Sequence, residues 1–225
     1  MAVIHHTTMQ PTKLELLAAW LPTRSWYTAA DDGPRPAKAG GFRIDDPEGE
    51  VGIEFMAVAD GTDDDAAVYL VPLTYRGAPL DGAEHALIGT SEHGVLGTRW
   101  IYDGAHDPVL VGQLAAVLTG RAVAQDQSLT DTPDATVAVT LAPGVDLADA
   151  RPVRVTEGPD HTDVLVGAPG TADGPTLRLH RVLRGGPDTA PGAGRLTSEW
   201  RRPDGSSGRG PFADVLAGGA GVDRT

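Results

Sequence analysis

Apolar residues near the start of the chain recur every three or four positions, which is the spacing of an amphipathic helix. One inward stripe would be formed by Leu14, Leu17, Ala18 and Leu21. Thr12 and Glu15 have the spacing of a capping box, in which the hydroxyl and the carboxylate each accept a hydrogen bond from a backbone N–H at the helix start. Pro22 disfavours continuation of the helix. We therefore predict a helix over about residues 12–21.

A second helical pattern follows the aromatic segment 100–102. Asp107 is of a residue type that caps helices, and Pro108 suits a first turn because its missing N–H would have no partner there. Leucines spaced by four residues then line one face until Gly120, a residue type that often follows a helix end. These signals predict a helix over about residues 107–119.

Most of the remaining chain shows short β-branched and aromatic runs, bounded by glycine and proline. The predicted strands are 42–44, 51–58, 67–75, 85–89, 100–102, 136–141, 152–156, 163–166, 176–183 and 195–200. Their short connections favour antiparallel pairing, since parallel strands need long crossovers. We therefore expect an α+β protein, with mainly antiparallel sheet and two principal helices.

Two details refine this strand pattern. Pro72 lies inside the predicted strand 67–75, and proline has no N–H to donate to a neighbouring strand. This predicts that the strand lies at a sheet edge or carries a bulge there. The acidic segment 60–65 is expected to be a hairpin turn that faces water.

The stretch 121–134 is polar and lacks periodic apolar residues, so we predict a linker or a long excursion there. A subdomain boundary could lie at this point. Residues 135–217 form a β-rich C-terminal region, which we expect either to pack into the same domain or to form a separate subdomain. Residues 218–225 are predicted to be a disordered tail.

Composition narrows the classes of partner. The net charge is −13, from 31 acidic and 18 basic residues, which argues against binding to nucleic acid or to an anionic membrane. The chain has no cysteine and shows neither a leader pattern nor an apolar run of membrane-spanning length, so we expect a cytoplasmic protein. One basic cluster stands out, and its simpler interpretation is a solvated strand face. It comprises Arg195, Arg201, Arg202 and Arg209.

Candidate chemistry is sparse. His85, His93 and His106 each stand beside an acid and could bind a metal ion, but their spacing matches no tight zinc motif. Ser91 lies near a histidine, yet the G-x-S-x-G turn of a serine hydrolase is absent. The glycine-rich segment 205–210 lacks the ending of a phosphate loop and predicts a hairpin turn. We therefore predict no catalytic residue, no metal and no cofactor.

Three segments in the first half share a distinctive order: LLAAWLPTRSWY at 16–27, YLVPLTY at 69–75 and WIYDGAHDP at 100–108. They resemble the N-terminal cap domain of maltokinases, in which a helix ends in W-L-P-x-x-R-W-[YF] and a V-x-D-A-x-x-D-P segment begins another helix. Ser25 interrupts the usual Arg-Trp pair. The resemblance covers about residues 10–120, which we expect to form a cap-like domain.

In maltokinases this cap precedes a two-lobed, kinase-like body that phosphorylates maltose with ATP, in actinobacterial trehalose and α-glucan metabolism. The chain shows none of the kinase catalytic motifs, and it resembles short, free-standing cap-like proteins of actinobacteria. The resemblance therefore implies a non-catalytic accessory or binding role. One alternative is an enzyme: a sugar kinase that acts with another chain, an enzyme related to glucan branching, or a small hydrolase that uses histidines. Another alternative is a structural homodimer joined near Pro72.

The resemblance also suggests partners and a site. We expect a protein partner or a glucan-related ligand, and self-association is a further option. Aromatic side chains could stack on sugar rings, although they also fill cores. The candidate ligand-binding residues flank the two most family-like segments. They are Trp26, Tyr27, Trp100, Tyr102 and Asp103.

Overall fold

The computed structural model describes residues 9–28, 33–61, 66–186 and 192–218. Two α-helices, α1 (Lys13–Trp20) and α2 (Pro108–Leu118), accompany three short 3-10 helices, η1 (Leu21–Thr23), η2 (Glu84–Ala86) and η3 (Gly104–His106). The strands are β1 (Met9–Gln10), β2 (Pro36–Ile44), β3 (Gly52–Asp60), β4 (Ala67–Arg76), β5 (Leu87–His93), β6 (Gly97–Asp103), β7 (Gln125–Asp126), β8 (Ala138–Leu141), β9 (Pro152–Glu157), β10 (His161–Val166), β11 (Thr176–His180), β12 (Gly194–Arg201) and β13 (Ser207–Leu216). The predicted α+β class is confirmed, with sheet predominating.

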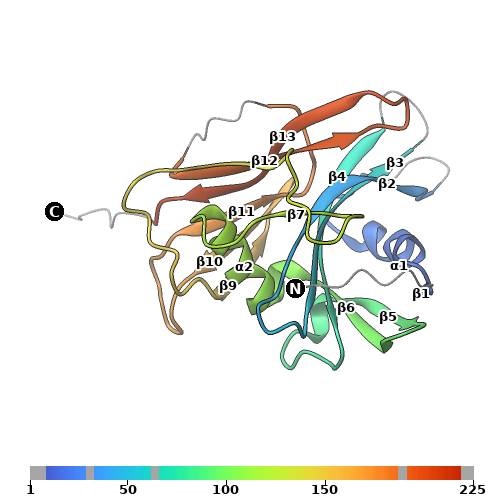
Figure 1. Ribbon diagram of the computed structural model, residues 1–225, viewed down its shortest axis with the longest axis horizontal. Coiled ribbons are helices and arrows are strands. Elements are labelled where there is room, and N and C mark those ends of the chain that lie inside the picture. The colour runs from blue at the N-terminus through green and yellow to red at the C-terminus, as the bar shows by residue number, and fades with distance from the viewer. Residues whose placement is uncertain (1–8, 29–32, 62–65, 187–191, 219–225) are drawn as a thin grey trace.

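The described strands form one sheet in which every pairing is antiparallel. Its order is β1-β5-β6-β4-β3-β2-β12-β13-β11-β10-β9, with β7 added to β2 and β8 added to β12. Figure 1 shows two arms, β1 to β6 on one side and β9 to β13 on the other. The two arms meet at β2 and β12, where Gly40 and Trp200 are paired.

The arms meet a second time beyond the end of β11. Leu70 of β4 donates its backbone N–H to the carbonyl oxygen of Arg181 at 2.9 Å, and Leu183 donates to the carbonyl of Val68 at 2.7 Å. A bridge between Tyr69 and Val182 lies between these bonds. The strands from β4 through β12 to β11 therefore close into a ring.

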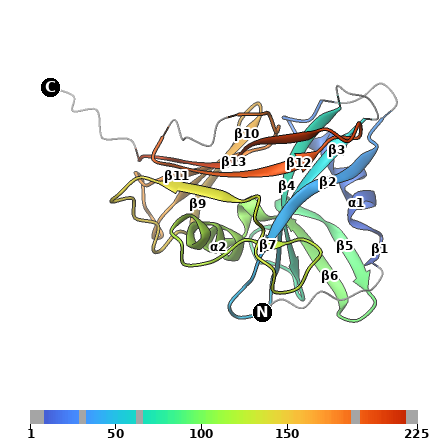
Figure 2. The same ribbon diagram turned by 45° about the horizontal axis from the view of Figure 1, so that its top comes forward.

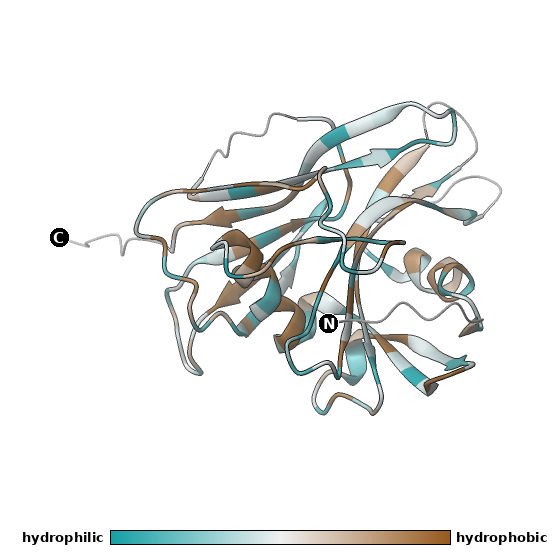
Figure 3. Ribbon diagram, in the orientation of Figure 1, coloured by the Kyte–Doolittle hydropathy of each residue, from teal (hydrophilic) through white to brown (hydrophobic). Residues whose placement is uncertain are grey.

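Helix α2 packs inside this ring. Figure 2 shows it beneath β11, β12 and β13, and in Figure 3 much of its ribbon has the brown colour of apolar residues. Its leucines share one core with aromatic residues from both arms, among them Phe42, Phe55 and Phe212. The predicted cap is present, because the Asp107 side chain accepts a hydrogen bond from the N–H of Val109 at 2.9 Å.

Helix α1 covers the opposite face of β3 and β4. Successive side chains of a strand point to opposite faces. Phe55 of β3 therefore faces the core around α2, while Met56 and Val58 face the core under α1. The predicted capping box is confirmed, since the backbone N–H of Thr12 donates to the Glu15 carboxylate at 2.7 Å and the Thr12 hydroxyl accepts from the N–H of Glu15.

The prediction for Pro72 is wrong. Strand β4 lies inside the sheet between β3 and β6, and its pairing with β3 carries no register shift at Pro72. Its other edge changes partner at this point: residues 68–70 bond the segment after β11, and residues 73–76 pair with β6. Pro72 occupies the gap between the two partners, where no N–H is needed. This strand therefore offers no free edge to a second copy.

Two further expectations need correction. Of the two interpretations of the segment 121–134, the excursion is correct and the linker is not, because the segment adds β7 to the edge of β2 and buries Ala124 in the core around α2. The turn near Gly205 was expected, but the strand that follows it, β13, was missed. The predicted acidic turn at 60–65 and the C-terminal tail lie largely outside the described residues.

No helix in the described parts of the chain combines the length and the apolar character needed to cross a bilayer.

Candidate ligand pocket at the start of α1

A cavity of about 430 Å³ opens where the start of α1 meets the ends of β3 and β4. The β5–β6 hairpin and the loop before β3 form further walls, and Gln127 reaches in from the segment after β7. Ligand pockets commonly measure about 300 to 1,000 Å³. The size of the cavity therefore suits a small ligand.

Glu54 is the organising residue of this pocket. Lys13 Nζ lies 3.0 and 2.8 Å from its two carboxylate oxygens. Tyr75 donates its hydroxyl at 2.6 Å, and Gln127 donates Nε2 at 2.9 Å. The carboxylate thus fixes three donor side chains that come from α1, β4 and the segment after β7.

The strand pattern explains why an acid is buried here. Alternation along β3 puts Glu54 on the same face as Met56 and Val58, at the point where the cover provided by α1 begins. Only 6% of Glu54 is exposed. Burial by itself raises the pKa of this carboxyl, but the charge and hydrogen bond of Lys13 and the Tyr75 hydroxyl outweigh it and lower the pKa.

Tyr75 is held as a neutral donor. Its burial, followed by the charge and the hydrogen bond of Glu54, raises the pKa of its hydroxyl well above the ordinary value. Gly52 is its partner across the strands, and a Cβ there would lie 3.2 Å from the Tyr75 ring. A glycine at this position therefore leaves room for the ring against the strand.

Arg43 and Arg99 also line the pocket. Arg43 donates to the carbonyl oxygens of Asp126 at 3.0 Å and Leu129 at 3.2 Å. Arg99 donates to the carbonyl oxygen of Leu96 at 2.6 Å. Both guanidinium groups are thus fixed by backbone carbonyls.

The five candidates from the sequence do not line this pocket. Trp26 is buried beneath α1 and stacks edge-on with Trp20 at 5.8 Å between ring centroids. Tyr27 is half-buried, and its hydroxyl donates to Asp60 at 2.6 Å. The structure thus places this pair in the packing around Tyr69, which lies within 5.8 Å of Trp26.

Tyr102 and Trp100 belong to a separate small cluster around η2. The Tyr102 hydroxyl accepts the backbone N–H of Leu80 at 2.9 Å. Asp103 is buried and forms an ion pair with Arg181, whose guanidinium also lies 5.3 Å from the Trp26 ring. The structure therefore brings Trp26 and Asp103 together through an arginine from the C-terminal half. The Trp26–Tyr27 pair and the Trp100–Tyr102 pair lie in two separate clusters.

The histidines are only partly assembled. His85 and His106 are in contact, with 3.1 Å between Nε2 and Nδ1, whereas His93 lines the pocket around Glu54. Burial lowers the pKa of His106 against the opposing charge of Asp103. In the described part of the chain, no group of three or more potential ligands is arranged to hold a metal ion.

The basic cluster is dispersed. Arg195 is buried and pairs with Asp214 at 2.6 Å, and Arg209 donates to the carbonyl of Thr136 at 2.7 Å. Arg201 is exposed. Arg195 therefore does not belong to a solvated face, whereas Arg201 lies at the surface.

Sequence reasoning missed Glu54 as the centre of the pocket. One signal was available, because Glu54 is the sole acid within the otherwise apolar run 51–58. A carboxylate in such a run is almost never buried without a partner. The partners themselves lie 21 to 73 residues away, at Tyr75, Lys13 and Gln127, and nothing in the local sequence identifies them.

Comparison with known protein families places the first half of the chain. Residues 20–107 match the model of the maltokinase N-terminal cap domain, while the search of curated proteins found no match. The matched region begins at Trp20, the last residue of α1, and ends at Asp107, the cap of α2. It includes β2 to β6 and therefore the strands that build the pocket. The family match thus confirms, over residues 20–107, the resemblance to the maltokinase N-terminal cap domain that the sequence indicates.

Proposed function

We propose that this chain is a non-catalytic accessory protein that binds a small ligand of α-glucan, maltose or trehalose metabolism. The pocket around Glu54 carries the proposal. It combines a concave site, an aromatic residue and several convergent polar groups, which is the usual composition of a ligand site. The family match supplies the metabolic link.

The roles of the other family-like polar residues support binding rather than chemistry. Arg76 forms a two-pronged ion pair with Asp107, at 2.6 and 2.7 Å. Asp103 pairs with Arg181 at 2.6 Å. These charges hold strands and helix starts together, so they are engaged in the scaffold. We also propose a cytoplasmic location in an actinobacterium, from the acidic, cysteine-free composition and the resemblance.

Titration calorimetry on the full chain tests the ligand. Maltose, trehalose, short maltooligosaccharides and phosphorylated glucose are the probes. We expect at least one to bind, and we expect Glu54→Gln to weaken it tenfold or more, because Lys13 and Tyr75 lose the charge that orients them. Asp163→Asn is the matched control, since it removes an acid from the Arg178 pair on β10 and β11. Absence of binding by every probe would contradict the proposal.

A second assay tests the absence of catalysis. The purified chain is incubated with ATP, magnesium and the same sugars, and sugar phosphate is measured. We expect none above a blank without protein. Product formation that an acid substitution abolishes would show an enzyme, and association with another protein that is unaffected by Glu54→Gln would favour a protein partner at a different surface.

A further inference from the structure

The pocket around Glu54 contains two positive charges without a carboxylate partner. Arg43 donates to the carbonyls of Asp126 and Leu129, and Arg99 donates to the carbonyl of Leu96. Among the described residues, neither guanidinium forms an ion pair. Each group therefore keeps its full charge beside the same cavity.

Two of the three acids that line the pocket have partners. Glu54 is paired with Lys13. Asp46 is buried, and its carboxylate accepts the backbone N–H groups of Glu48, Glu50 and Val51 at 3.0 to 3.1 Å. Glu50 also lines the cavity and is exposed. Arg43 and Arg99 are therefore the lining cations that a ligand could still pair with.

Arg99 also has an unused donor. Its Nε is buried and has no hydrogen-bond partner. A buried donor without a partner destabilises a fold. Arg99 therefore carries an unsatisfied N–H on a side chain that lines the cavity.

Part of the remaining wall is apolar. Met9, Leu96 and the ring of Tyr75 line the cavity, and the ring lies under Lys13 at 5.9 Å. A bare inorganic ion would leave this surface uncovered. The combination fits a molecule with an anionic end and an organic body.

We propose that the pocket binds a small organic anion, whose phosphate or carboxylate oxygens are held by Arg43 and Arg99 and whose body lies against Met9, Tyr75 and Leu96. Guanidinium groups match the planar or tripod arrangement of such oxygens. The proposal rests on the proposed function and narrows its ligand to an acidic derivative, such as a sugar phosphate or a sugar acid.

The net charge of −13 does not oppose this site. At physiological ionic strength the Debye length is about 8 Å, so exposed charges farther away are largely screened. Side chains that line the cavity therefore set the potential that a bound ligand experiences.

Calorimetry with the full chain separates the contributions that the sugar ring, the negative charge and the phosphate group make to binding. The probes are glucose, glucose 1-phosphate, glucuronate, phenyl phosphate and inorganic phosphate. We expect glucose 1-phosphate and glucuronate to bind at least tenfold more tightly than glucose, because both add an oxyanion to the same ring. Inorganic phosphate is expected to bind more weakly than either. The proposal is overturned if glucose, or inorganic phosphate, binds as tightly as glucose 1-phosphate.

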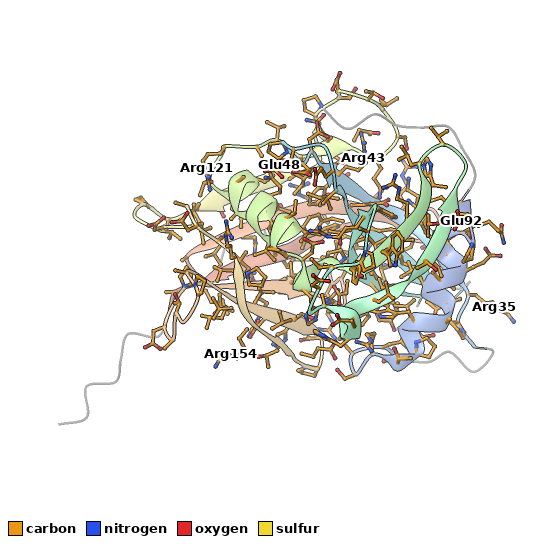
Figure 4. All side chains as sticks on the ribbon, turned by 90° about the horizontal axis from the view of Figure 1, so that it is seen from below. Arg35, Arg43, Glu48, Glu92, Arg121 and Arg154 are labelled. Atoms are coloured by element: carbon orange, nitrogen blue, oxygen red, sulfur yellow. The ribbon has the colours of Figure 1, made fainter. Side chains whose placement is uncertain are left out.

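Three variants locate the anion. Arg43→Gln and Arg99→Gln are each expected to weaken glucose 1-phosphate at least fivefold and to bring its affinity closer to that of glucose. Arg154→Gln is the control, because Arg154 is exposed on β9 and lies far from Arg43 in Figure 4. Circular dichroism checks that each variant folds. If Arg43→Gln loosens the segment after β7, which Arg43 holds, the result for Arg99→Gln still tests the assignment. A preference for the anion that survives both substitutions overturns the assignment.

The same panel distinguishes this inference from the proposed function. Tight binding of phenyl phosphate, equal to that of glucose 1-phosphate and sensitive to Arg99→Gln, supports the anion site but contradicts the link to sugars. Equal binding of glucose and glucose 1-phosphate contradicts the anion site and leaves the sugar link intact. Absence of binding by every probe contradicts both the anion site and the proposed function.

Discussion

Asp103 and Arg181 are 78 residues apart in the sequence and form an ion pair with 2.6 Å between Oδ2 and Nη2, in which the side chains are 3% and 0% exposed. Arg181 also donates to the Thr162 hydroxyl at 2.7 Å. The pair therefore joins the end of β6 in the cap region to the segment after β11 in the C-terminal region.

Breaking this pair should destabilise the whole chain. Arg181→Met leaves the carboxylate of Asp103 buried without its counter-charge, and removing one partner of a buried pair costs about 3 to 5 kcal/mol. Urea unfolding followed by tryptophan fluorescence measures the change. Arg184→Met is the control, since its pair with Asp160 is largely exposed and should contribute at most about 1 kcal/mol. Equal effects of the two substitutions would contradict a structural role for the buried pair.

Asp107 should stabilise the fold in two separable ways. Asn is a good helix cap but carries no charge, so Asp107→Asn keeps the cap of α2 and removes the ion pair with Arg76, at a cost of about 2 kcal/mol. Asp107→Ala should cost about 1 kcal/mol more, because the bond to the Val109 N–H is also lost. Urea unfolding tests the order. Arg76→Gln should cost at least as much as Asp107→Asn, because it leaves the buried Asp107 carboxylate without its counter-charge. Equal losses of stability for Asp107→Asn and Asp107→Ala would show that the cap contributes nothing.

The stability of the fold should fall at acid pH, because Asp214 then becomes protonated. Burial raises the pKa of this carboxyl, but hydrogen bonds from Arg195 and His180 and their charges lower it to about 2, below its ordinary value of 3.8. A lowered pKa stabilises the fold above about pH 4, and this contribution is lost as the pH falls towards 2. Urea midpoints measured from pH 6 to pH 2 should decline less steeply in Asp214→Asn than in the unmodified chain. Parallel curves would rule out this contribution.

Gly41 should not tolerate a side chain. Its φ is +117°, and a Cβ would collide with the carbonyl oxygen of Phe55 on β3. We expect Gly41→Ala to cost about 3 kcal/mol, combining strain and overpacking. Gly49→Ala is the matched control, since Gly49 also has a positive φ, +74°, but open space around it, and should cost about 1 kcal/mol. Thermal unfolding compares the two, and a smaller loss for Gly41→Ala would contradict the close approach of β2 to β3 at this position.

Local signals predicted the helices and most strands because their causes are local. The capping box at Thr12 and the Asp107–Pro108 start of α2 depend on groups within a few residues, and both are present. Strand β13 was missed because glycines and a proline interrupt its apolar alternation. Its stability comes from pairing with β11 and β12 rather than from its own composition.

Pro72 shows the limit of a rule based on one residue. A missing N–H predicted an edge strand, and the structure satisfied the same constraint in another way, by changing the partner of β4 at that position. The sequence could state the constraint at Pro72 but could not choose between its solutions.

The sequence by itself determined the elements of this protein: two capped helices, short antiparallel strands, an acidic surface and a resemblance that the family match confirmed. Tertiary structure decided what those elements bring together. Lys13 reaches Glu54 across 41 residues, and Gln127 reaches it across 73. Such contacts depend on the order of strands in the closed sheet, and that order is set by how two cores are buried at once, a global balance that no local pattern encodes.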